Sequence, residues 1–406
     1  MEKIVYILDE FPKLSETFIF REILGLKKVN VDLEIISMKS PVKKLIPSEL
    51  ADIVKTTIYI PPLCSIKVLV VHLYFLLKNP IKYLYIFSYL FLLIRNYRNL
   101  RLFIRTIYHF GVGIYLSKIV KTKGIKHIHA HLASGPTTVA LVISKTLNLP
   151  FSFTAHAIDI YADSIILEEK LKQSKFVVTC THFNKKYLLS LCKDIPEEKI
   201  NMIYHGIPIN KFNINERKEE KELLILSVGR LVEKKGFPYL IEACKTLMDK
   251  KYEFKCIIVG NGVMYEELNK LIQDYNLEKT ITLNKELPFD EIMKLYKKAS
   301  IFVLPCIIAS NNDRDGIPNT ILEAMAFSIP VVSTRISGIP EVIEDMKTGL
   351  LIKEKDKEAL TSAIELLIKD KTLRDRLGKN GRVKIIENFD IEKNTNELVR
   401  LFKKDI

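Results

Sequence analysis

Short β-branched runs alternate with helical patterns along the whole chain. Nine such runs predict strands, at 3–8, 31–38, 127–131, 151–156, 176–181, 223–229, 254–260, 299–305 and 329–334. Many of these runs carry apolar residues without alternation, which is typical of parallel strands that helices cover on both faces. The repeated strand–helix order therefore predicts an α/β protein with doubly wound parallel sheets.

A polar, charge-dense stretch at 209–222 interrupts this pattern and is typical of a linker. The chain has 406 residues, whereas single cores stop growing at about 250–300 residues. We therefore expect two Rossmann-like domains facing a central cleft, at 1–207 and 223–384, joined by a linker at 208–222. Residues 385–406 predict a C-terminal helix, and whether it crosses back to the first domain stays open at this point.

Charge is distributed unevenly along the chain. There are 62 Lys and Arg against 48 Asp and Glu, a net charge of +14, yet no acidic residue lies between Asp52 and Asp159. This acid-free segment is also among the most apolar in the chain, so it is not a disordered basic arm. It carries no recognised nucleic-acid motif, and anionic lipid suits cations set among apolar runs better than nucleic acid does.

Apolar runs at 68–77 and 83–94 are shorter than the roughly 20 residues of a membrane-spanning helix, so no span is expected. The N-terminus has no signal-peptide pattern, and we expect a cytoplasmic protein. The six cysteines show no metal-ligand spacing, which favours buried free thiols and no metal site.

Four arginines follow a helical spacing inside the acid-free segment. Arg95, Arg98, Arg101 and Arg105 are three, three and four residues apart, which on one helix places them on an arc of roughly 120°. The remaining positions are largely apolar, and a basic amphipathic helix is typical of binding to an anionic membrane surface. An ordinary domain helix whose arginines face water is the alternative.

In the second half, the sequence "SVGRLVEKKGF" places Gly229 and Arg230 at the end of a predicted strand, with Lys235 five residues on. Two cations on a loop at a strand's carboxyl end suit a diphosphate, although a solvated basic turn has the same pattern. The next strand ends at Gly260 and Gly262, where glycine permits close approach to a ligand or simply makes a tight turn.

The sequence "DRDGIPNTILEAMAF" predicts a turn followed by a helix. Gly316 allows the turn and Pro318 suits the first helical position, so the helix N-terminus is available to an anion. Asp315 precedes this helix, and an N-terminal cap is its alternative role. Glu323 lies in an apolar stretch, where a buried carboxylate needs donors that sugar hydroxyls would supply.

In the first half, "SETFI" opens a helix after the first predicted strand. Ser15 is the expected cap, with Glu16 and Thr17 following and their N–H groups facing the cleft; plain capping is the alternative. His156 ends a later strand with Asp159 nearby, and a purely structural histidine is the alternative there.

Taken together, "SVGRLVEKKG", "DGIPNTILEAMA" and "FTAHAID" resemble the GT-B-fold retaining glycosyltransferases of family 4 (group 1). The segments "FPKLSETFI" and "HIHAHLA" are similar to the branch of colanic-acid and related exopolysaccharide glycosyltransferases. The resemblance implies transfer from a nucleotide-diphosphate sugar, expected to be a UDP-sugar, without a metal. It also implies a lipid-linked or saccharide acceptor and a peripheral location on the inner face of the cell membrane.

By this resemblance, Asp315 contacts the hydroxyls of the transferred sugar and Glu323 the ribose. Arg230 and Lys235 grip the pyrophosphate, and His156 lies near the sugar. The other expected donor-binding positions are Gly229, Gly260, Gly262, Gly316, Ile317, Pro318 and Asn319. Two features depart from the family: position 315 is Asp where Glu is commoner, and the loop with Ser15 lacks paired glycines. An epimerase or phosphorylase of the same fold, or a non-enzymatic binding protein, are the alternatives.

Overall fold

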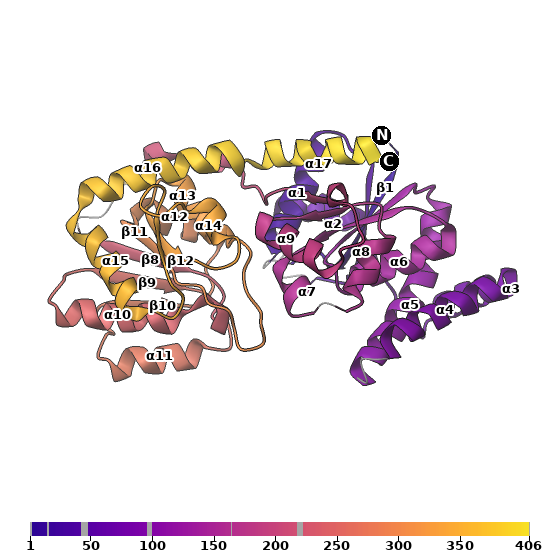
Figure 1. The fold of residues 1–406 in the computed structure, drawn as a ribbon, viewed down its shortest axis with the longest axis horizontal. Coiled ribbons are helices and arrows are strands. Elements are labelled where there is room, and N and C mark those ends of the chain that lie inside the picture. Colours follow the sequence, from indigo (N-terminus) through magenta and orange to yellow (C-terminus); the bar gives the residue numbers. More distant parts are fainter. Residues whose placement is uncertain are drawn as a thin grey trace. The chain divides into compact units, whose positions relative to one another are not determined.

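The computed structural model describes residues 2–13, 16–41, 48–95, 100–163, 165–216 and 222–405. The chain divides into two compact units, each built around one sheet (Figure 1). The first unit comprises Met1–Cys180, Asn184–Ile203 and Thr395–Ile406, and the second comprises Thr181–Phe183 and Tyr204–Asn394. Each unit therefore combines segments that are far apart in the sequence.

The first unit contains a seven-stranded sheet in the order β3–β2–β1–β4–β5–β6–β7, with all neighbouring strands parallel. The strands are β1 (Ile4–Glu10), β2 (Leu33–Lys39), β3 (Ile58–Tyr59), β4 (His127–His131), β5 (Phe151–Ala155), β6 (Val177–Thr179) and β7 (Ile200–Met202). Alternate residues of β1 enter two different cores: Val5 and Ile7 pack on one face, and Ile4 and Tyr6 on the other. Burial on both faces explains the unbroken apolar run of this strand.

Helices cover both faces of this sheet. They are α1 (Thr17–Lys28), α2 (Ala51–Thr56), α3 (Ile66–Lys78), α4 (Pro80–Ile94), α5 (Leu100–Thr122), α6 (Gly135–Leu147), α7 (Ala157–Tyr161), α8 (Leu167–Gln173), α9 (His182–Leu191) and α17 (Ile391–Asp405). Phe402 of α17 packs against Tyr6 and Phe176, which ties the end of the chain to the first unit. No helix in the described ranges is both long enough and apolar enough to cross a membrane.

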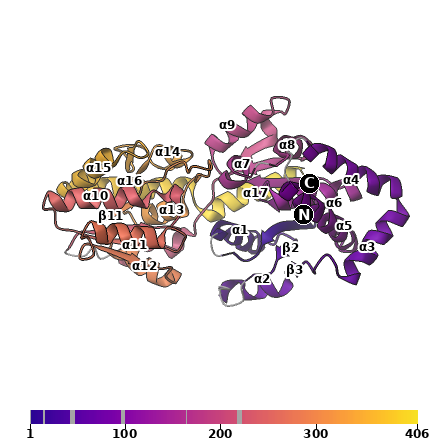
Figure 2. The same ribbon diagram turned by 90° about the horizontal axis from the view of Figure 1, so that it is seen from below.

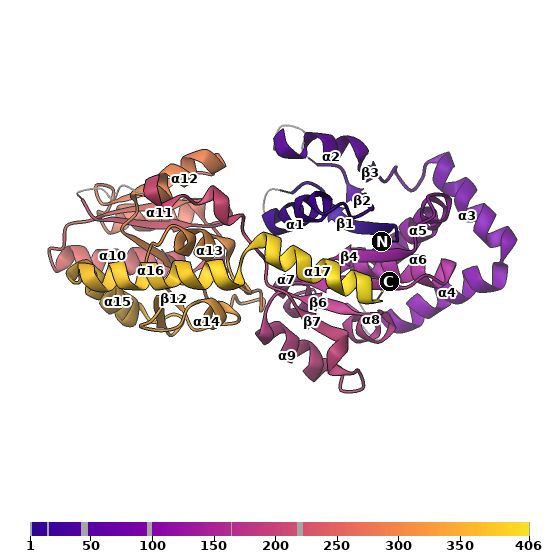
Figure 3. The same ribbon diagram turned by 90° about the horizontal axis from the view of Figure 1, so that it is seen from above.

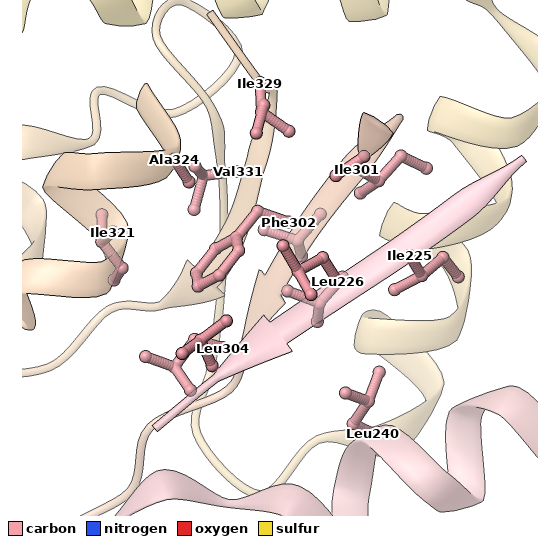
Figure 4. Packing of buried hydrophobic residues seen from close by; sticks show 14 of the residues in the cluster. Ile225, Leu226, Leu240, Ile301, Phe302, Leu304, Ile321, Ala324, Ile329 and Val331 are labelled. Atoms are coloured by element: carbon pink, nitrogen blue, oxygen red, sulfur yellow. The ribbon is translucent and has the colours of Figure 1, made fainter. Parts of the chain in front are cut away.

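The second unit contains a six-stranded parallel sheet in the order β10–β9–β8–β11–β12–β13. Its strands are β8 (Leu224–Val228), β9 (Lys255–Val259), β10 (Ile281–Asn284), β11 (Ile301–Leu304), β12 (Val331–Thr334) and β13 (Leu350–Ile352). Its helices are α10 (Phe237–Asp249), α11 (Tyr265–Asp274), α12 (Phe289–Lys298), α13 (Asn319–Ala326), α14 (Ile339–Val342), α15 (Lys357–Lys369) and α16 (Lys371–Asn388). Figure 4 shows Leu226, Phe302 and Val331 of adjacent strands, with Ile321 and Ala324 of α13 in the same core.

The predicted α/β class with two doubly wound sheets is confirmed, and all nine predicted strands form. Four further strands, β3, β7, β10 and β13, have two to four residues each and lie at the edges of the sheets. An edge strand has one neighbour and can be short and partly polar. These strands therefore lack the long apolar runs by which the central strands are predicted.

The expected single basic helix face is wrong. Arg95 follows the last residue of α4, whereas Arg101 and Arg105 lie on α5, and these two helices pack against each other. Arg98 lies outside the described residues. Arg105 pairs with Asp163 inside the unit, with 2.6 Å between Nη2 and Oδ1. All six cysteines are free thiols, and all except Cys64 are buried.

Both sheets reverse their order at one point, between β1 and β4 in the first unit and between β8 and β11 in the second. In open α/β sheets, ligands bind outside the carboxyl ends of the strands at such a switch point. The loops that follow β8 and β11 carry Arg230, Lys235 and Asp315. The topology of the second unit thus brings together residues that are about eighty positions apart in sequence.

Candidate functional site

The loop after β8 turns into a short 3₁₀ helix, Glu233–Lys235, before α10 begins. Gly236 has a φ of +68°, and a Cβ there would lie only 1.9 Å from the carbonyl oxygen of Pro305. Ile307 N donates to the carbonyl oxygen of Lys234 at 2.9 Å. The loops after β8 and β11 are therefore locked together, and a side chain at position 236 would separate them.

Four charged side chains meet where these loops touch. Lys235 Nζ lies 2.7 Å from Asp315 Oδ2, and Lys234 Nζ lies 3.3 Å from Asp315 Oδ1. Lys234 Nζ also lies 3.0 Å from Asp313 Oδ1. Both lysines are buried. Each buried cation therefore has a carboxylate partner, as a buried charge requires. We call these four residues the charged cluster.

The pairing keeps Asp315 and Lys235 ionised. Burial raises the pKa of Asp315, but the charges of Lys235 and Lys234 outweigh burial and hold that pKa well below its usual range. Burial lowers the pKa of Lys235, and Asp315 raises it above its ordinary value. Cys306, whose sulfur lies 3.8 Å from Asp315 Oδ2, has its pKa raised by burial to about 12. It is a neutral thiol at this site rather than a nucleophile.

Arg230 lies beside the charged cluster on the same loop. Its side chain is exposed, and it forms no ion pair with any other described residue. The loop thus presents the exposed guanidinium of Arg230 next to the buried ammonium of Lys235, whose positive charge is paired with Asp315. An anionic ligand could bind the first directly, and would have to share the second with Asp315.

The glycines at 260 and 262 hold this loop in place. A Cβ at Gly260 would lie 1.9 Å from the carbonyl oxygen of Gly229, and one at Gly262 would lie 2.3 Å from that of Leu231. Leu231 N donates to the carbonyl oxygen of Asn261 at 2.9 Å. The backbone of 229–231 passes directly over both glycines, so either substitution would displace the loop that carries Arg230.

Helix α13 begins at Asn319, with Pro318 at its N-cap in an extended conformation (ψ 128°). The prediction of Pro318 as the first helical residue is therefore wrong by one position. The N-cap position is Pro318 and the carboxylate of Asp315 pairs with Lys234 and Lys235, so the alternative role of Asp315 as the N-cap residue is also wrong. Gly316 and Ile317 are half-buried in the loop just before the helix.

Glu323 is buried on α13, as its apolar neighbours suggest. The hydroxyl of Tyr296 on α12 lies within donating distance of Glu323 Oε2 at 3.2 Å and of the carbonyl oxygen of Thr320 at 3.3 Å. A protein side chain, Tyr296, thus supplies a donor to this carboxylate, where sugar hydroxyls were expected to be the donors.

In the first unit, His156 follows β5 and is the N-cap residue of α7. Its backbone N–H donates to Asp159 Oδ1 at 2.6 Å, and Asp159 Oδ2 accepts from Ala133 N. Burial raises the pKa of Asp159 to about 8, although these backbone donors oppose the rise. Asp159 therefore ties the loop after β4 to the turn that carries His156.

Lys170 supports the same loop from α8. Its ammonium donates to the carbonyl oxygens of Ala133, Ser134 and Ile165 at 2.6, 2.9 and 2.9 Å. The side chain is fully buried, and burial lowers its pKa to about 7. This lysine acts as a set of hydrogen-bond donors, because its partners are neutral carbonyls.

A second set of polar side chains, from β1, α1 and β4, is linked to His156 through His131. Tyr6 donates its hydroxyl to Glu22 Oε1 at 2.8 Å, and His131 Nε2 lies 2.9 Å from the same oxygen. His131 Nδ1 lies 3.5 Å from His156 Nε2, and the ring of Phe18 lies 4.7 Å from that of His156. The ring of His156 is thus contacted by His131 from the end of β4 and by Phe18 from α1.

The described residues of the N-terminal loop test only part of the predicted start of α1. Ser15 lies outside the described residues. The N-cap residue of α1 is Glu16, whose side chain makes no capping hydrogen bond and pairs with Lys13 at 2.6 Å. Thr17 is the first residue of the helix.

Sequence reasoning missed Lys234, Asp313 and Tyr296. The first two stand beside predicted residues, in "EKKG" and "DRDG", and the doubled charges are a signal that could have found them. Tyr296 is 27 residues from Glu323 on another helix, and nothing in the local sequence indicates their contact.

Two family models match the chain. "Glycosyl transferases group 1" matches residues 209–384, and "Glycosyltransferase Family 4" matches residues 67–211. The amylovoran biosynthesis glycosyltransferase AmsK of Erwinia amylovora is 42% identical over 170 residues, which is 42% of each chain. The putative colanic acid biosynthesis glycosyltransferase WcaL of Escherichia coli is 35% identical over 212 residues, covering 51% of this chain and 52% of WcaL. The chain therefore spans about half the length of the curated relatives it matches.

Solved structures match the fold over nearly the full length. A glycosyltransferase from Rickettsia africae has a TM-score of 0.73 at 19% identity, covering 99% of this chain and 98% of its own. Anabaena HepE in complex with UDP and glucose has a TM-score of 0.71 at 15% identity, covering 99% and 100%. At these identities the likeness establishes the two-sheet architecture.

Proposed function

Because the chain belongs to the group 1, family 4 glycosyltransferases and has their GT-B-like fold, we propose that it transfers a sugar from a nucleotide-diphosphate donor to a lipid-linked or saccharide acceptor. A UDP-sugar is the proposed donor, which is supported by the complexes of the structural relative HepE with UDP and with UDP-glucose. The names of AmsK and WcaL support a role in cell-surface polysaccharide biosynthesis.

The charged cluster beside exposed Arg230 carries this proposal. The donor pyrophosphate binds Arg230 and Lys235, and these two fixed cations offset the charge that develops on the leaving nucleoside diphosphate. Asp315 keeps Lys235 protonated and in position before the donor arrives. Two positioned cations supply at this point the charge that a divalent metal supplies in other transferases, so no metal is required.

The carboxylates recognise hydroxyl groups in this proposal. When the pyrophosphate draws Lys235 away from Asp315, the freed carboxylate oxygen accepts from a hydroxyl of the transferred sugar. Glu323 accepts from the ribose hydroxyls, with Tyr296 fixing its orientation through the 3.2 Å contact. The backbone from Gly316 to Asn319 leads into α13 and contributes N–H groups to the phosphates. Gly229, Gly260 and Gly262 shape the loop that receives the donor.

In this proposal the acceptor binds to the first unit. His156 contacts the sugar as a hydrogen-bonding group, held in place by Asp159 and by His131. Glu16 and Thr17 lie at the start of α1, where many family members have a glycine-rich loop. Retention of configuration, which the family resemblance implies, is part of this proposal. The enzyme works at the inner surface of the cell membrane, where an anionic bilayer presents the lipid-linked acceptor.

A transfer assay tests the proposal. Purified protein is incubated with UDP-sugars and polyprenyl-diphosphate-linked saccharides, and the products are identified by mass spectrometry. Lys235→Ala and Glu323→Ala are expected to lower turnover by about 10²–10³-fold, while Lys245→Ala, which removes the partner of Asp249 on α10, leaves it unchanged. Unchanged turnover in both site variants would refute the assignment, and an epimerised or phosphorolysed donor with no transfer would favour a different reaction on the same fold.

A further inference from the structure

A groove of about 420 Å³ opens in the first unit at the ends of four helices. Helices α3, α5 and α6 end at this groove and α4 begins there, and its floor is apolar, including Phe75, Ile86 and Leu147. Its volume is within the range of small-molecule sites.

This groove is not part of the candidate site. Lys126, which lines it, immediately precedes β4, and Leu149 lies just before β5. The groove is therefore at the amino ends of the strands, whereas His156 follows the carboxyl end of β5. Whatever binds there is on the opposite edge of the sheet from the proposed reaction.

Cations line the groove without carboxylates among the described residues. Four lysines line it, namely Lys78, Lys82, Lys121 and Lys126, and no carboxylate of the described residues does. Two of these ammonium groups have neutral hydrogen-bonding partners: Lys78 donates to the hydroxyl of Tyr74 at 3.1 Å, and Lys82 donates to Asn148 Oδ1 at 3.0 Å.

The dipoles of the helices that end at the groove offset only part of the positive charge of its lysines. Three helix C-termini and one N-terminus contribute about half an elementary charge each, for a sum of about −1, so the four lysines leave about +3. A fifth lysine, Lys118, stands 4.5 Å from the ring centroid of Tyr74, on which Lys78 also rests at 5.5 Å. Like charges gathered in this way are stabilised by an anion between them.

The outer surface of the α3–α4 hairpin is strongly apolar. Figures 2 and 3 show α3 and α4 as the outermost layer of this unit, beyond α5 and α6. At the turn, Leu77 and Ile81 are 73% and 82% exposed. Further large apolar side chains exposed on these helices are Ile66, Leu69, Val70, Leu73, Leu84, Tyr85, Phe87, Phe91 and Leu92. Many exposed large apolar side chains on two helices in contact are typical of an interface.

We propose that the turn of the α3–α4 hairpin inserts into the interfacial layer of an anionic bilayer, with the phosphate of a bilayer phospholipid bound in the lysine groove. The two features occur together at one turn: lysines suited to phosphate and apolar side chains suited to the acyl boundary. A second copy of this chain is a poor occupant, because it would bring two cationic groups face to face.

This inference deepens the membrane location in the proposed function, but lipid binding itself needs no catalysis. The membrane contact proposed here differs from the one predicted from Arg95, Arg101 and Arg105. Arg95 lies at the other end of α4 from the turn, about 20 Å away at the rise of a helix. The two placements can therefore be separated by experiment.

A tryptophan reporter tests insertion directly, because the chain contains no tryptophan. Ile81→Trp is titrated with vesicles of phosphatidylcholine alone and of phosphatidylcholine mixed with phosphatidylglycerol. We expect a blue shift of its emission with the mixed vesicles only. The matched reporter Val263→Trp, at a 91% exposed position of the second unit, should not shift. No shift at position 81, equal shifts at both positions, or an equal shift with phosphatidylcholine alone would each overturn the proposal.

Charge reversal tests the groove. Vesicle flotation of Lys78→Glu/Lys82→Glu/Lys121→Glu should be weakened by at least about 100-fold, and that of Arg95→Glu/Arg101→Glu much less. Circular dichroism checks that both variants fold. Equal losses, or a larger loss in the arginine variant, would place the membrane contact elsewhere and overturn the proposal.

Two further arms identify the source of the phosphate and separate this inference from the proposed function. Inorganic phosphate should not displace the protein from mixed vesicles at concentrations equal to that of the lipid phosphate; displacement would point to a site for free phosphate instead and contradict the lipid assignment. Lys235→Ala, which should abolish transfer, should still float with the vesicles. Its failure to do so would show that binding depends on the donor site and overturn an independent lipid groove.

Discussion

The two units treat buried ionisable groups in opposite ways. In the second unit, the charged cluster holds two carboxylates and two ammonium groups within ion-pair distance, and Asp315 stays ionised. In the first unit, burial raises the pKa of Asp159 to about 8 and lowers that of Lys170 to about 7, and neither forms an ion pair with the other. The second unit therefore holds permanently charged side chains near its switch point. The first unit holds buried side chains whose pKa values lie near neutral pH.

The comparison shows that the neighbour decides the charge of a buried carboxylate, not its place in the fold. Asp159 lies in the first turn of α7, which follows β5, and Asp315 lies in the loop between β11 and α13, so both belong to segments at the carboxyl ends of parallel strands. Asp315 has two lysines within 3.3 Å, whereas Asp159 has backbone N–H groups. Opposite charges favour the ionised form by more than hydrogen bonds do once desolvation is counted.

The largest expected effect is the loss of folding stability caused by Asp315→Ala. The change leaves two buried lysines with only Asp313 between them, and removing one partner of a buried ion pair costs about 3–5 kcal/mol. Urea unfolding should show this loss, while Asp274→Ala, at an exposed position of α11, should change the free energy of unfolding little. A loss below about 1 kcal/mol would mean that the charged cluster is not the tightly paired group described above.

Lys170→Met should have a smaller effect. It removes three hydrogen bonds to carbonyl oxygens but leaves no charge without a partner, at a cost of about 2–3 kcal/mol. The control is Lys172→Met on the exposed side of the same helix. A loss as large as that of Asp315→Ala would indicate that the first unit also depends on a buried charge.

The pH dependence of stability separates the units further. The folded pKa of Asp159 is about 8 and the unfolded one about 4, so between these values the fold holds a proton that the unfolded chain has lost. Stability from this group therefore falls as pH rises, by at most about 1.4 kcal/mol between pH 6 and pH 7. Asp159→Asn should remove that fall in urea-unfolding curves at the two pH values. A fall of the same size in the variant, or a rise with pH in the wild type that Asp159→Asn removes, would contradict the raised pKa.

The smallest predicted effect concerns Tyr296→Phe. Removing the hydroxyl that contacts Glu323 should raise the KM for the donor by about two- to tenfold, which corresponds to one neutral hydrogen bond, with little change in kcat. Tyr265→Phe, on α11, is the matched control. A drop in kcat with an unchanged KM would mean that Tyr296 acts on the transition state and not in donor binding.

Most of the fold was predictable, because a buried parallel strand carries an apolar run that marks it in the sequence. The contact of Lys235 with Asp315 was not predicted as such, but both residues were singled out in loops that follow strands, and Glu323 was singled out as a carboxylate in an apolar helix. Partners on other helices were not. Tyr296 reaches Glu323 from another helix, and Lys170 reaches the loop after β4 from α8. The spacing of the arginines suggested one helix, and only the packing of α4 against α5 shows two.

Calorimetric titration of UDP-glucose into the wild type, Lys235→Ala and Lys170→Met tests most directly whether the second unit binds the donor. If the charged cluster of the second unit binds the donor, Lys235→Ala should weaken the binding of UDP-glucose by at least about 100-fold. A loss of this size is expected when a buried charge-assisted contact to pyrophosphate is removed. Lys170→Met should bind within about threefold of the wild type, because its hydrogen bonds hold only the first unit. Wild-type affinity in Lys235→Ala, or loss of binding only in Lys170→Met, would contradict the assignment of the donor to the second unit.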